Sequence, residues 1–267
     1  MLLLAALPVL LGTQAAPPGC IQLKAPRVNM RANVARATSS PWVDANAWRF
    51  LRAPAAPFCI DAPGNTSALA AAEAFAYGVK AFIKTSAAPA GFDRVEPFSR
   101  MVAFLKDLPP ADLPAMVNIG LVDDGSPAAG ELMNLLSRRN LLYRLEKSRD
   151  PAVPVNVTRI EPGDPAKQAY AIRRELTDDK RLLRLYGSEV VIGRLTGNAR
   201  RARLYLLNYS QRPVNGLRVR VLGVYPHAAA HIFNQPADKL ADFAAADGAT
   251  EFTITRLNEC AVIDLAL

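Results

Sequence analysis

Two patterns of apolar and polar residues divide the chain near residue 180. Between residues 58 and 160, short apolar runs alternate with helical stretches, which is typical of strand–helix–strand units on a parallel sheet. The predicted strands here are Phe58–Asp61, Lys80–Lys84, Met116–Val122, Leu141–Glu146 and Val155–Ile160. We therefore predict an α/β fold with a mainly parallel sheet over residues 58–180.

Four helices are predicted, three between these strands and one after the last. Glu96–Leu108 carries an apolar face and stops at a double proline, and Ser126 is placed to cap a helix that runs to about Arg139. Thr66 or Ser67 could cap an alanine-rich helix that Gly78 closes. The last helix spans about Pro165–Leu176. The apolar face of the helix Glu96–Leu108 consists of Phe98, Met101, Val102 and Leu105.

After residue 180 the chain reads as short strands with turn residues between them and no helical pattern. The run Leu217–Val221 alternates apolar and polar residues with the period of a half-buried strand. Several such strands at this spacing favour an antiparallel sandwich over residues 181–267. The predicted strands are Glu189–Leu195, Ala202–Tyr209, Gly216–Tyr225, which contains this run, Thr250–Thr255 and Cys260–Leu265.

The N-terminus resembles a secretion signal. An apolar run from Leu2 to Leu11 is too short to span a bilayer, which takes about 20 residues, and small residues follow it. We expect cleavage after Ala15, which makes residues 1–15 a signal peptide and the protein exported, periplasmic or extracellular. Residues 16–57 are predicted to be an extended or loop segment, with one candidate strand at Val28–Arg36.

Composition narrows the range of partners and cofactors. The net charge is +8, but its 24 Arg and 8 Lys are spread along the chain without a lysine-rich run, so we expect no nucleic acid. No later segment is apolar enough for a transmembrane helix, and no Gly-rich nucleotide loop points to a cofactor. His227 and His231 lie in a predicted loop without a third ligand, so no metal site is expected. Three cysteines, Cys20, Cys59 and Cys260, leave at least one unpaired; Cys260 reads as a buried small hydrophobe.

Three stretches taken together resemble the C-terminal portion of barrel-type glycoside hydrolases, in particular the trimeric beta-galactosidases. Ala68–Lys84 is similar to the last helix–strand step of the barrel, Asn118–Glu146 to the first unit of an amidotransferase-like domain, and Leu182–Leu265 to the final β-sandwich. The resemblance implies a flavodoxin- or amidotransferase-like α/β domain before the sandwich, and a carbohydrate setting. The barrel strands that carry the family's catalytic glutamates are absent, and no Gly-x-Cys-x-Gly turn occurs, so no catalytic residue is carried over.

Two strings are candidates for a binding site. Asp123 and Asp124 follow a predicted strand, and the ends of parallel strands face the crevice that α/β sheets use for ligands. Their position also resembles the acidic pair of a response-regulator receiver domain, but its later aspartate is not found, and a structural role is the alternative. The second string runs from Trp42 to Arg52 and holds both tryptophans beside polar groups that suit a sugar. Its candidate binding residues are Trp42, Asp44, Trp48 and Arg52.

The function hypothesis is an exported, glycoside hydrolase-like protein without a recognisable active site, which binds carbohydrate or assists assembly. Its partner would be a glycan or polysaccharide. One alternative is an active hydrolase of glycosidic bonds with a carboxylate pair drawn from Asp44, Asp61, Asp123 and Asp124. The other is an interaction module whose β-sandwich docks another protein.

Overall fold

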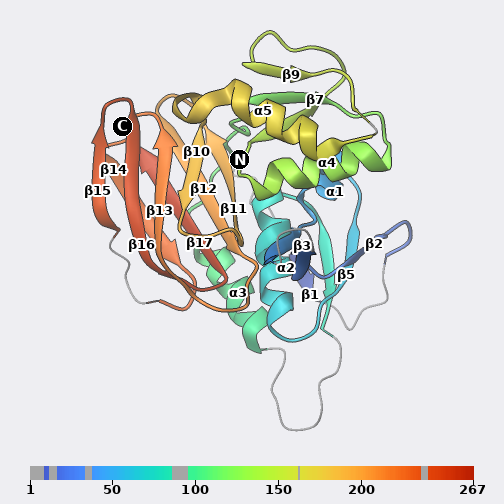
Figure 1. The fold of residues 1–267 in the computed structure, drawn as a ribbon. Coiled ribbons are helices and arrows are strands. Elements are labelled where there is room, and N and C mark those ends of the chain that lie inside the picture. The colour runs from blue at the N-terminus through green and yellow to red at the C-terminus, as the bar shows by residue number, and fades with distance from the viewer. Residues whose placement is uncertain (1–8, 12–16, 34–37, 86–95, 162, 236–239) are drawn as a thin grey trace, which may run out of the picture.

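The structure is a computed structural model that describes residues 9–11, 17–33, 38–85, 96–161, 163–235 and 240–267. Figure 1 shows an α/β part, blue to yellow, beside a part made of antiparallel strands, orange to red. The last helix, α5 (Pro165–Lys180), ends two residues before the first antiparallel strand of the second part, β10 (Leu183–Tyr186). The change of pattern near residue 180 therefore coincides with a change of secondary structure.

The parallel strands form two sheets, where we had expected one mainly parallel sheet. The first has the order β1-β6-β5-β2, with β1 (Val9–Leu11), β6 (Ala81–Lys84), β5 (Phe58–Asp61) and β2 (Ile21–Lys24). The second has the order β8-β7-β9, with β8 (Tyr143–Glu146), β7 (Ile119–Val122) and β9 (Val155–Val157). All their pairings are parallel.

The segment before β7 pairs with the second part of the molecule. The amide of Met116 donates to the carbonyl of Leu195, 3.0 Å away, and the amide of Gly197 donates to Pro114, 2.8 Å away. These bonds place the segment beside β11 (Val191–Gly197), while β8 and β9 occupy both edges of β7, so β7 does not join the sheet of β5 and β6. The apolar run Met116–Val122 was predicted as one strand, and only its second half joins the parallel sheet.

Helix ends follow the local sequence closely. In α4 (Pro127–Arg138) the Ser126 side chain accepts the amide of Ala129 at 3.1 Å, as predicted for an N-cap. Helix α2 (Asn65–Tyr77) closes at Gly78 in the left-handed region, and α3 is Glu96–Asp107. The predicted cap of α2 was wrong. Thr66 and Ser67 lie inside its first turn, where their hydroxyls donate to the carbonyls of Pro63 and Gly64.

Residues 16–57 contain more regular structure than the predicted extended segment. Strand β3 (Arg27–Asn33) and strand β4 (Thr38–Asp44) form an antiparallel hairpin, and α1 (Ala47–Arg52) follows. A disulfide between Cys20 and Cys59 ties the start of β2 to β5, and Cys260 is free and buried. Of the predicted signal peptide, the structure describes Val9–Leu11, paired with β6 at the edge of the first sheet; the rest lies outside the described residues.

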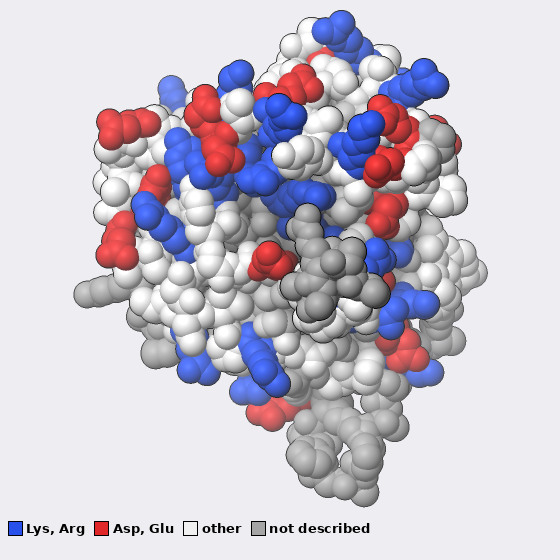
Figure 2. Space-filling model, viewed as in Figure 1, with Lys and Arg blue, Asp and Glu red and all other residues white. Residues whose placement is uncertain are grey.

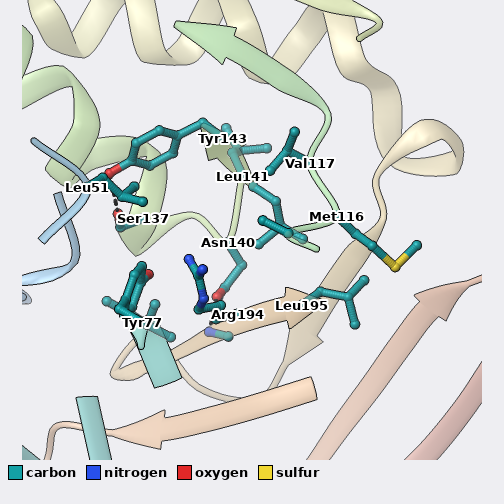
Figure 3. A pocket seen from close by; sticks show the side chains of 14 residues that line it. Leu51, Tyr77, Met116, Val117, Ser137, Asn140, Leu141, Tyr143, Arg194 and Leu195 are labelled. Atoms are coloured by element: carbon teal, nitrogen blue, oxygen red, sulfur yellow. Dashed lines mark hydrogen bonds between the residues drawn. The ribbon is translucent and has the colours of Figure 1, made fainter. Parts of the chain in front are cut away.

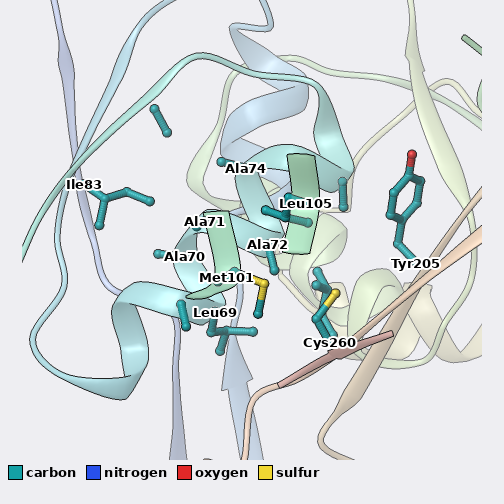
Figure 4. Packing of buried hydrophobic residues seen from close by; sticks show 14 of the residues in the cluster. Leu69, Ala70, Ala71, Ala72, Ala74, Ile83, Met101, Leu105, Tyr205 and Cys260 are labelled. Carbon is teal, nitrogen blue, oxygen red and sulfur yellow. The ribbon is translucent and has the colours of Figure 1, made fainter. Parts of the chain in front are cut away.

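Helix α2 lies at the centre of the core. Its alanines are almost all fully buried, and they allow close contact with α3 on one side and with the antiparallel strands on the other. Figure 4 shows Met101 and Leu105 of α3 against α2, with Tyr205 and Cys260 of the antiparallel strands nearby. The α/β part and the antiparallel part therefore share one hydrophobic core rather than meeting at a polar interface.

The second part consists of two four-stranded antiparallel sheets whose apolar faces pack together. The sheet orders are β10-β13-β16-β15 and β11-β12-β17-β14, which confirms the predicted antiparallel character of residues 181–267. No helix occurs in the described residues of this range. The remaining strands are β12 (Arg201–Asn208), β13 (Val214–Leu222), β14 (His227–Ile232), β15 (Ala241–Ala246), β16 (Ala249–Leu257) and β17 (Cys260–Ala266).

The two histidines lie in strand β14, where a loop was predicted. Their strand is short and rich in alanine, but it pairs with β17 over its whole length, from His227 opposite Ala266 to Ile232 opposite Ala261. The local pattern is too weak to predict a strand here, and pairing with the apolar strand β17 stabilises it.

Charges of both signs are interspersed on the surface. Figure 2 shows acidic side chains beside basic ones over both parts of the face in view. Asp178, at the end of α5, pairs with both Arg181 and Arg184, at 3.5 Å and 3.1 Å. The excess of arginine is thus partly balanced by local ion pairs.

Candidate functional site

The six predicted site residues separate into two groups in the structure. Arg52 contacts both Trp48 and Asp123, with Asp124 beside Asp123 and Asp44 linked to Trp48 through Arg49. Trp42 lies apart from them, on the β3–β4 hairpin against the end of α4. We call Asp44, Trp48, Arg49, Arg52, Asp123 and Asp124 the Trp48 cluster.

The link between Arg52 and Asp123 joins α1 to the carboxyl end of β7. The guanidinium donates from Nε and from Nη2 to the two oxygens of Asp123, each at 2.8 Å. Nη2 also donates to the carbonyl of Ser126 at 3.0 Å. A forked guanidinium–carboxylate pair of this kind has a fixed orientation and is among the stronger ion pairs. The side chains are 23% and 15% exposed, so solvent screens the pair only in part.

Trp48 lies on α1 and packs against α4. The guanidinium carbons of Arg49 and Arg52 lie 4.2 Å and 4.9 Å from its ring centroid. A side chain on Gly130 would lie 3.1 Å from two atoms of the ring, so the absence of a Cβ at this position of α4 permits the contact. The half-buried indole therefore orients both arginines through cation–π contacts.

Asp123 and Asp124 shape the turn from β7 into α4. The amide of Gly125 donates to Oδ1 of Asp123 at 3.0 Å, and the amide of Ser126 donates to Oδ1 of Asp124 at 2.9 Å. Hydrogen bonds from Ser126 hold the pKa of Asp124 below its usual value, so this exposed carboxylate is ionised at neutral pH. The side chain as a whole is exposed to solvent.

Asp44, at the end of β4, completes the Trp48 cluster. Its Oδ1 lies 3.4 Å from Nη1 of Arg49, which also donates to the carbonyl of Ala45 at 3.0 Å. Both side chains of the pair are about a third exposed. The cluster is therefore a half-exposed surface of alternating carboxylates and guanidiniums around one indole.

Trp42 is engaged by two other arginines. The guanidinium carbon of Arg31 lies 3.2 Å from its ring centroid and that of Arg138 lies 3.8 Å from it. Arg138 also donates to the carbonyl of Pro41 at 2.9 Å, which fastens the hairpin to α4. Guanidinium groups thus occupy the stacking surface of the ring that a sugar would need.

The carboxylates that a hydrolase would use are mostly committed to structural contacts. Asp44 and Asp123 pair with arginines, and Asp124 caps a turn. Asp61 ends β5 with an exposed side chain, and no described residue bonds to it. Within the described ranges no three side chains of His, Cys, Asp or Glu come together as metal ligands, and none of the described helices is long and apolar enough to cross a membrane.

Glu73 is a buried carboxyl that the sequence analysis did not single out. It is completely buried on α2 and accepts hydrogen bonds from the amide of Asn46 and the hydroxyl of Tyr209, both at 2.7 Å. Burial raises its pKa to about 7. The sequence could have indicated this buried carboxyl, because Glu73 lies on the apolar side of a predicted alanine-rich helix.

The comparisons with known proteins concern the fold. No protein-family model matches the chain, and no curated protein matches its sequence. Among solved structures it is similar to alpha-L-fucosidase isoenzyme 2 from Paenibacillus thiaminolyticus, with a TM-score of 0.54 and 9% identity. That match covers 79% of this chain and 60% of the fucosidase, so this chain spans less than two thirds of that protein. A noncanonic maltogenic alpha-amylase, AmyB from Thermotoga neapolitana, is 11% identical over 79% of this chain and 51% of that one, with a TM-score of 0.23.

The fold is therefore glycoside hydrolase-like. This confirms the expected resemblance at the level of architecture, through the fucosidase match alone, because a TM-score of 0.23 carries no argument. The narrower resemblance to trimeric beta-galactosidases and the amidotransferase-like arrangement of the α/β part stay predictions.

Proposed function

We propose that this protein is an exported, non-catalytic carbohydrate-binding protein with a glycoside hydrolase-like fold, and that a glycan contacts the Trp48 cluster. The observation that carries the proposal is the forked pair between Arg52 and Asp123 at the carboxyl end of β7. It uses a strand-end carboxylate for orientation, where a hydrolase would need that group free to transfer a proton or attack the sugar.

The polar groups that remain free suit sugar hydroxyls. Asp124 offers an exposed carboxylate oxygen as an acceptor, and Arg49 offers a partly exposed guanidinium as a donor. Both are oriented before a ligand arrives, by the turn at Ser126 and by the ring of Trp48. Such preorganisation reduces the entropy lost on binding.

Binding and hydrolysis should be measured together on the same purified chain. We expect saturable binding to at least one polysaccharide of a broad panel, without release of reducing sugar. Asp124→Ala and Arg49→Ala should each weaken that binding about tenfold, the scale of one or two lost hydrogen bonds. Each also removes a turn or ion-pair contact, so the melting temperature should fall by a few degrees at most.

Asp61→Ala is the matched control, because Asp61 is an exposed carboxylate at another strand end outside the Trp48 cluster. Its binding should equal that of the wild type. Hydrolysis by the wild type that Asp61→Ala or Asp124→Ala abolishes would establish the hydrolase alternative instead. Absence of binding across the panel would reject the carbohydrate proposal.

Export has its own support and its own test. The apolar run at residues 2–11 precedes small residues, and the Cys20–Cys59 disulfide is of the kind that persists in oxidising compartments. Sequencing the N-terminus of the protein recovered outside the cytoplasm should give a start near Ala16. A chain that retains Met1 would contradict cleavage.

A further inference from the structure

A small pocket lies where α2, the connection from α4 to β8, and β11 meet. Its volume is about 30 Å³, space for about two water-sized atoms. Figure 3 shows Arg194 reaching into it from β11 beside Tyr77, with Tyr143 and Ser137 on the opposite wall. The rest of the lining is mostly apolar and includes Leu51, Met116, Val117, Leu141, Leu142, Ile192 and Leu195. No carboxylate lines the pocket.

Arg194 brings a positive charge into this pocket without a countercharge. Its guanidinium carbon lies 4.2 Å from the ring centroid of Tyr77. Its Nε is shielded from solvent and has no hydrogen-bond partner among the described residues, and no described carboxylate lies within ion-pairing distance. Arginine stays protonated in proteins, and the Arg194 side chain is partly buried here without an ion-pair partner, which is unfavourable for its charge. The other arginines whose Nε atoms face carboxylates, such as Arg52 and Arg203, lie outside the pocket.

The backbone beneath Arg194 is held in place by Asn140. The amide of Gly193 donates to Oδ1 of Asn140 at 2.7 Å, and Nδ2 of Asn140 donates to the carbonyl of Val191 at 3.1 Å. Asn140 itself adopts a left-handed backbone with a φ of 52°, which asparagine tolerates better than most residues. This pair of bonds locks β11 against the end of α4, so Arg194 projects from a rigid base.

Three hydroxyls line the pocket. Those of Ser137 and Tyr143 bond to each other, and that of Tyr77 can donate to a ligand. Ser137 donates to the carbonyl of Met133 at 3.0 Å, which leaves Tyr143 to donate to Ser137 across 3.2 Å. The oxygen of Tyr77 accepts a hydrogen bond from Arg194, which leaves the Tyr77 proton without an acceptor among the described residues. Burial raises the pKa of Tyr77 above its usual value, so its hydroxyl is a donor at neutral pH. The pocket therefore presents donors and no free acceptor with a negative charge.

We propose that this pocket binds the carboxylate of a small ligand, with Arg194 as the ion-pair partner and the Tyr77 hydroxyl as a second donor. The space for about two water-sized atoms matches the two oxygens of a carboxylate and is too small for a phosphate. The free small acid and the acid group of a uronic sugar share this chemistry. The pocket shares no residue with the Trp48 cluster, so this proposal stands or falls independently of glycan binding there.

Acetate and its neutral analogue acetamide are the probes, titrated into the full chain at constant ionic strength and followed by calorimetry and thermal melting. We expect acetate to bind saturably and to raise the melting temperature, and acetamide to do neither. Arg194→Met should weaken acetate binding at least tenfold, and Tyr77→Phe should weaken it several-fold while keeping the ring contact. Arg194→Lys, which keeps the charge, should retain part of the affinity.

Arg201→Met is the control variant, since it removes one exposed positive charge from the neighbouring strand β12 and should bind acetate like the wild type. A galacturonate oligomer distinguishes the sources: tighter binding than acetate assigns the carboxylate to a sugar acid, and equal binding assigns it to a free small acid. Equal responses to acetate and acetamide, or equal acetate affinity in Arg194→Met and wild type, would overturn the proposal. Crystals soaked in acetate that show two waters beside Arg194 would also overturn it.

Discussion

The hydroxyl of Tyr209 donates a hydrogen bond of 2.7 Å to Oε1 of Glu73, although 136 residues separate them in the chain. Tyr209 follows the end of β12, and Glu73 lies on α2. The same carboxyl accepts the amide of Asn46 just before α1, so three segments meet at one buried group. Because Glu73 is fully buried, its hydrogen bonds must all be satisfied from within the protein.

Glu73 should make stability depend on pH. Its pKa rises from 4.5 in the unfolded chain to about 7 in the folded protein, chiefly through burial. Between these values the folded state binds the proton more tightly, so its stabilising contribution is complete below pH 4.5 and is lost as the pH rises through about 7. The wild type should therefore lose up to about 3 kcal/mol in its free energy of unfolding as the pH rises. Glu73→Gln should not show this loss.

Urea denaturation from pH 4.5 to pH 8 measures this effect. Glu175→Gln, which changes an exposed glutamate of α5, is the matched control and should keep the wild-type dependence. If Glu73→Gln follows the same curve as the wild type, the carboxyl is not the group that titrates.

The Arg52–Asp123 pair should contribute measurably to stability. Both partners are mostly shielded from solvent and joined by two hydrogen bonds, so a double-mutant cycle with Arg52→Ala and Asp123→Ala should give a coupling of about 1–2 kcal/mol. The pair Glu96–Arg100 on α3 is 52–56% exposed and should give below about 0.5 kcal/mol in the same measurement. A coupling as small as that of the α3 pair would show that Arg52 and Asp123 do not orient one another.

Trp42 should act as a structural anchor. Trp42→Ala removes the ring on which Arg31 and Arg138 stack, and we expect a loss of about 2 kcal/mol in the free energy of unfolding. Trp42→Phe keeps an aromatic surface and should lose about half as much. A variant that melts like the wild type but binds glycan more weakly would return Trp42 to the binding site.

The cysteines should differ sharply in reactivity. Cys260 is buried and burial raises its pKa to about 12, so the folded, oxidised protein should show no reactive thiol and the denatured protein one. Reduction should expose two more and lower the free energy of unfolding by about 4 kcal/mol, the chain-entropy value for a separation of 39 residues. Labelling of three thiols without a reductant would show that the disulfide is absent.

Much of the secondary structure followed from local patterns. The buried face of α3, the Ser126 cap of α4 and the Gly78 end of α2 were all predicted, because each depends on residues within one or two turns of helix. The alternation after residue 180 likewise predicted antiparallel strands. For the candidate site, the residue types and the strand-end position of Asp123 and Asp124 were visible in the sequence.

The partners of those residues depended on the tertiary structure. Arg52 meets Asp123 across 71 residues, and Trp42 meets Arg138 across the hairpin and α4, pairings that no local pattern encodes. The parallel strands divide into two sheets because β8 and β9 occupy both edges of β7, and the strand of His227 forms because β17 lies beside it. Steric and capping preferences depend on neighbouring residues and can be predicted from the sequence. Long-range hydrogen bonds and ion pairs form with whichever distant groups the folded chain brings near, so they could not be predicted from it.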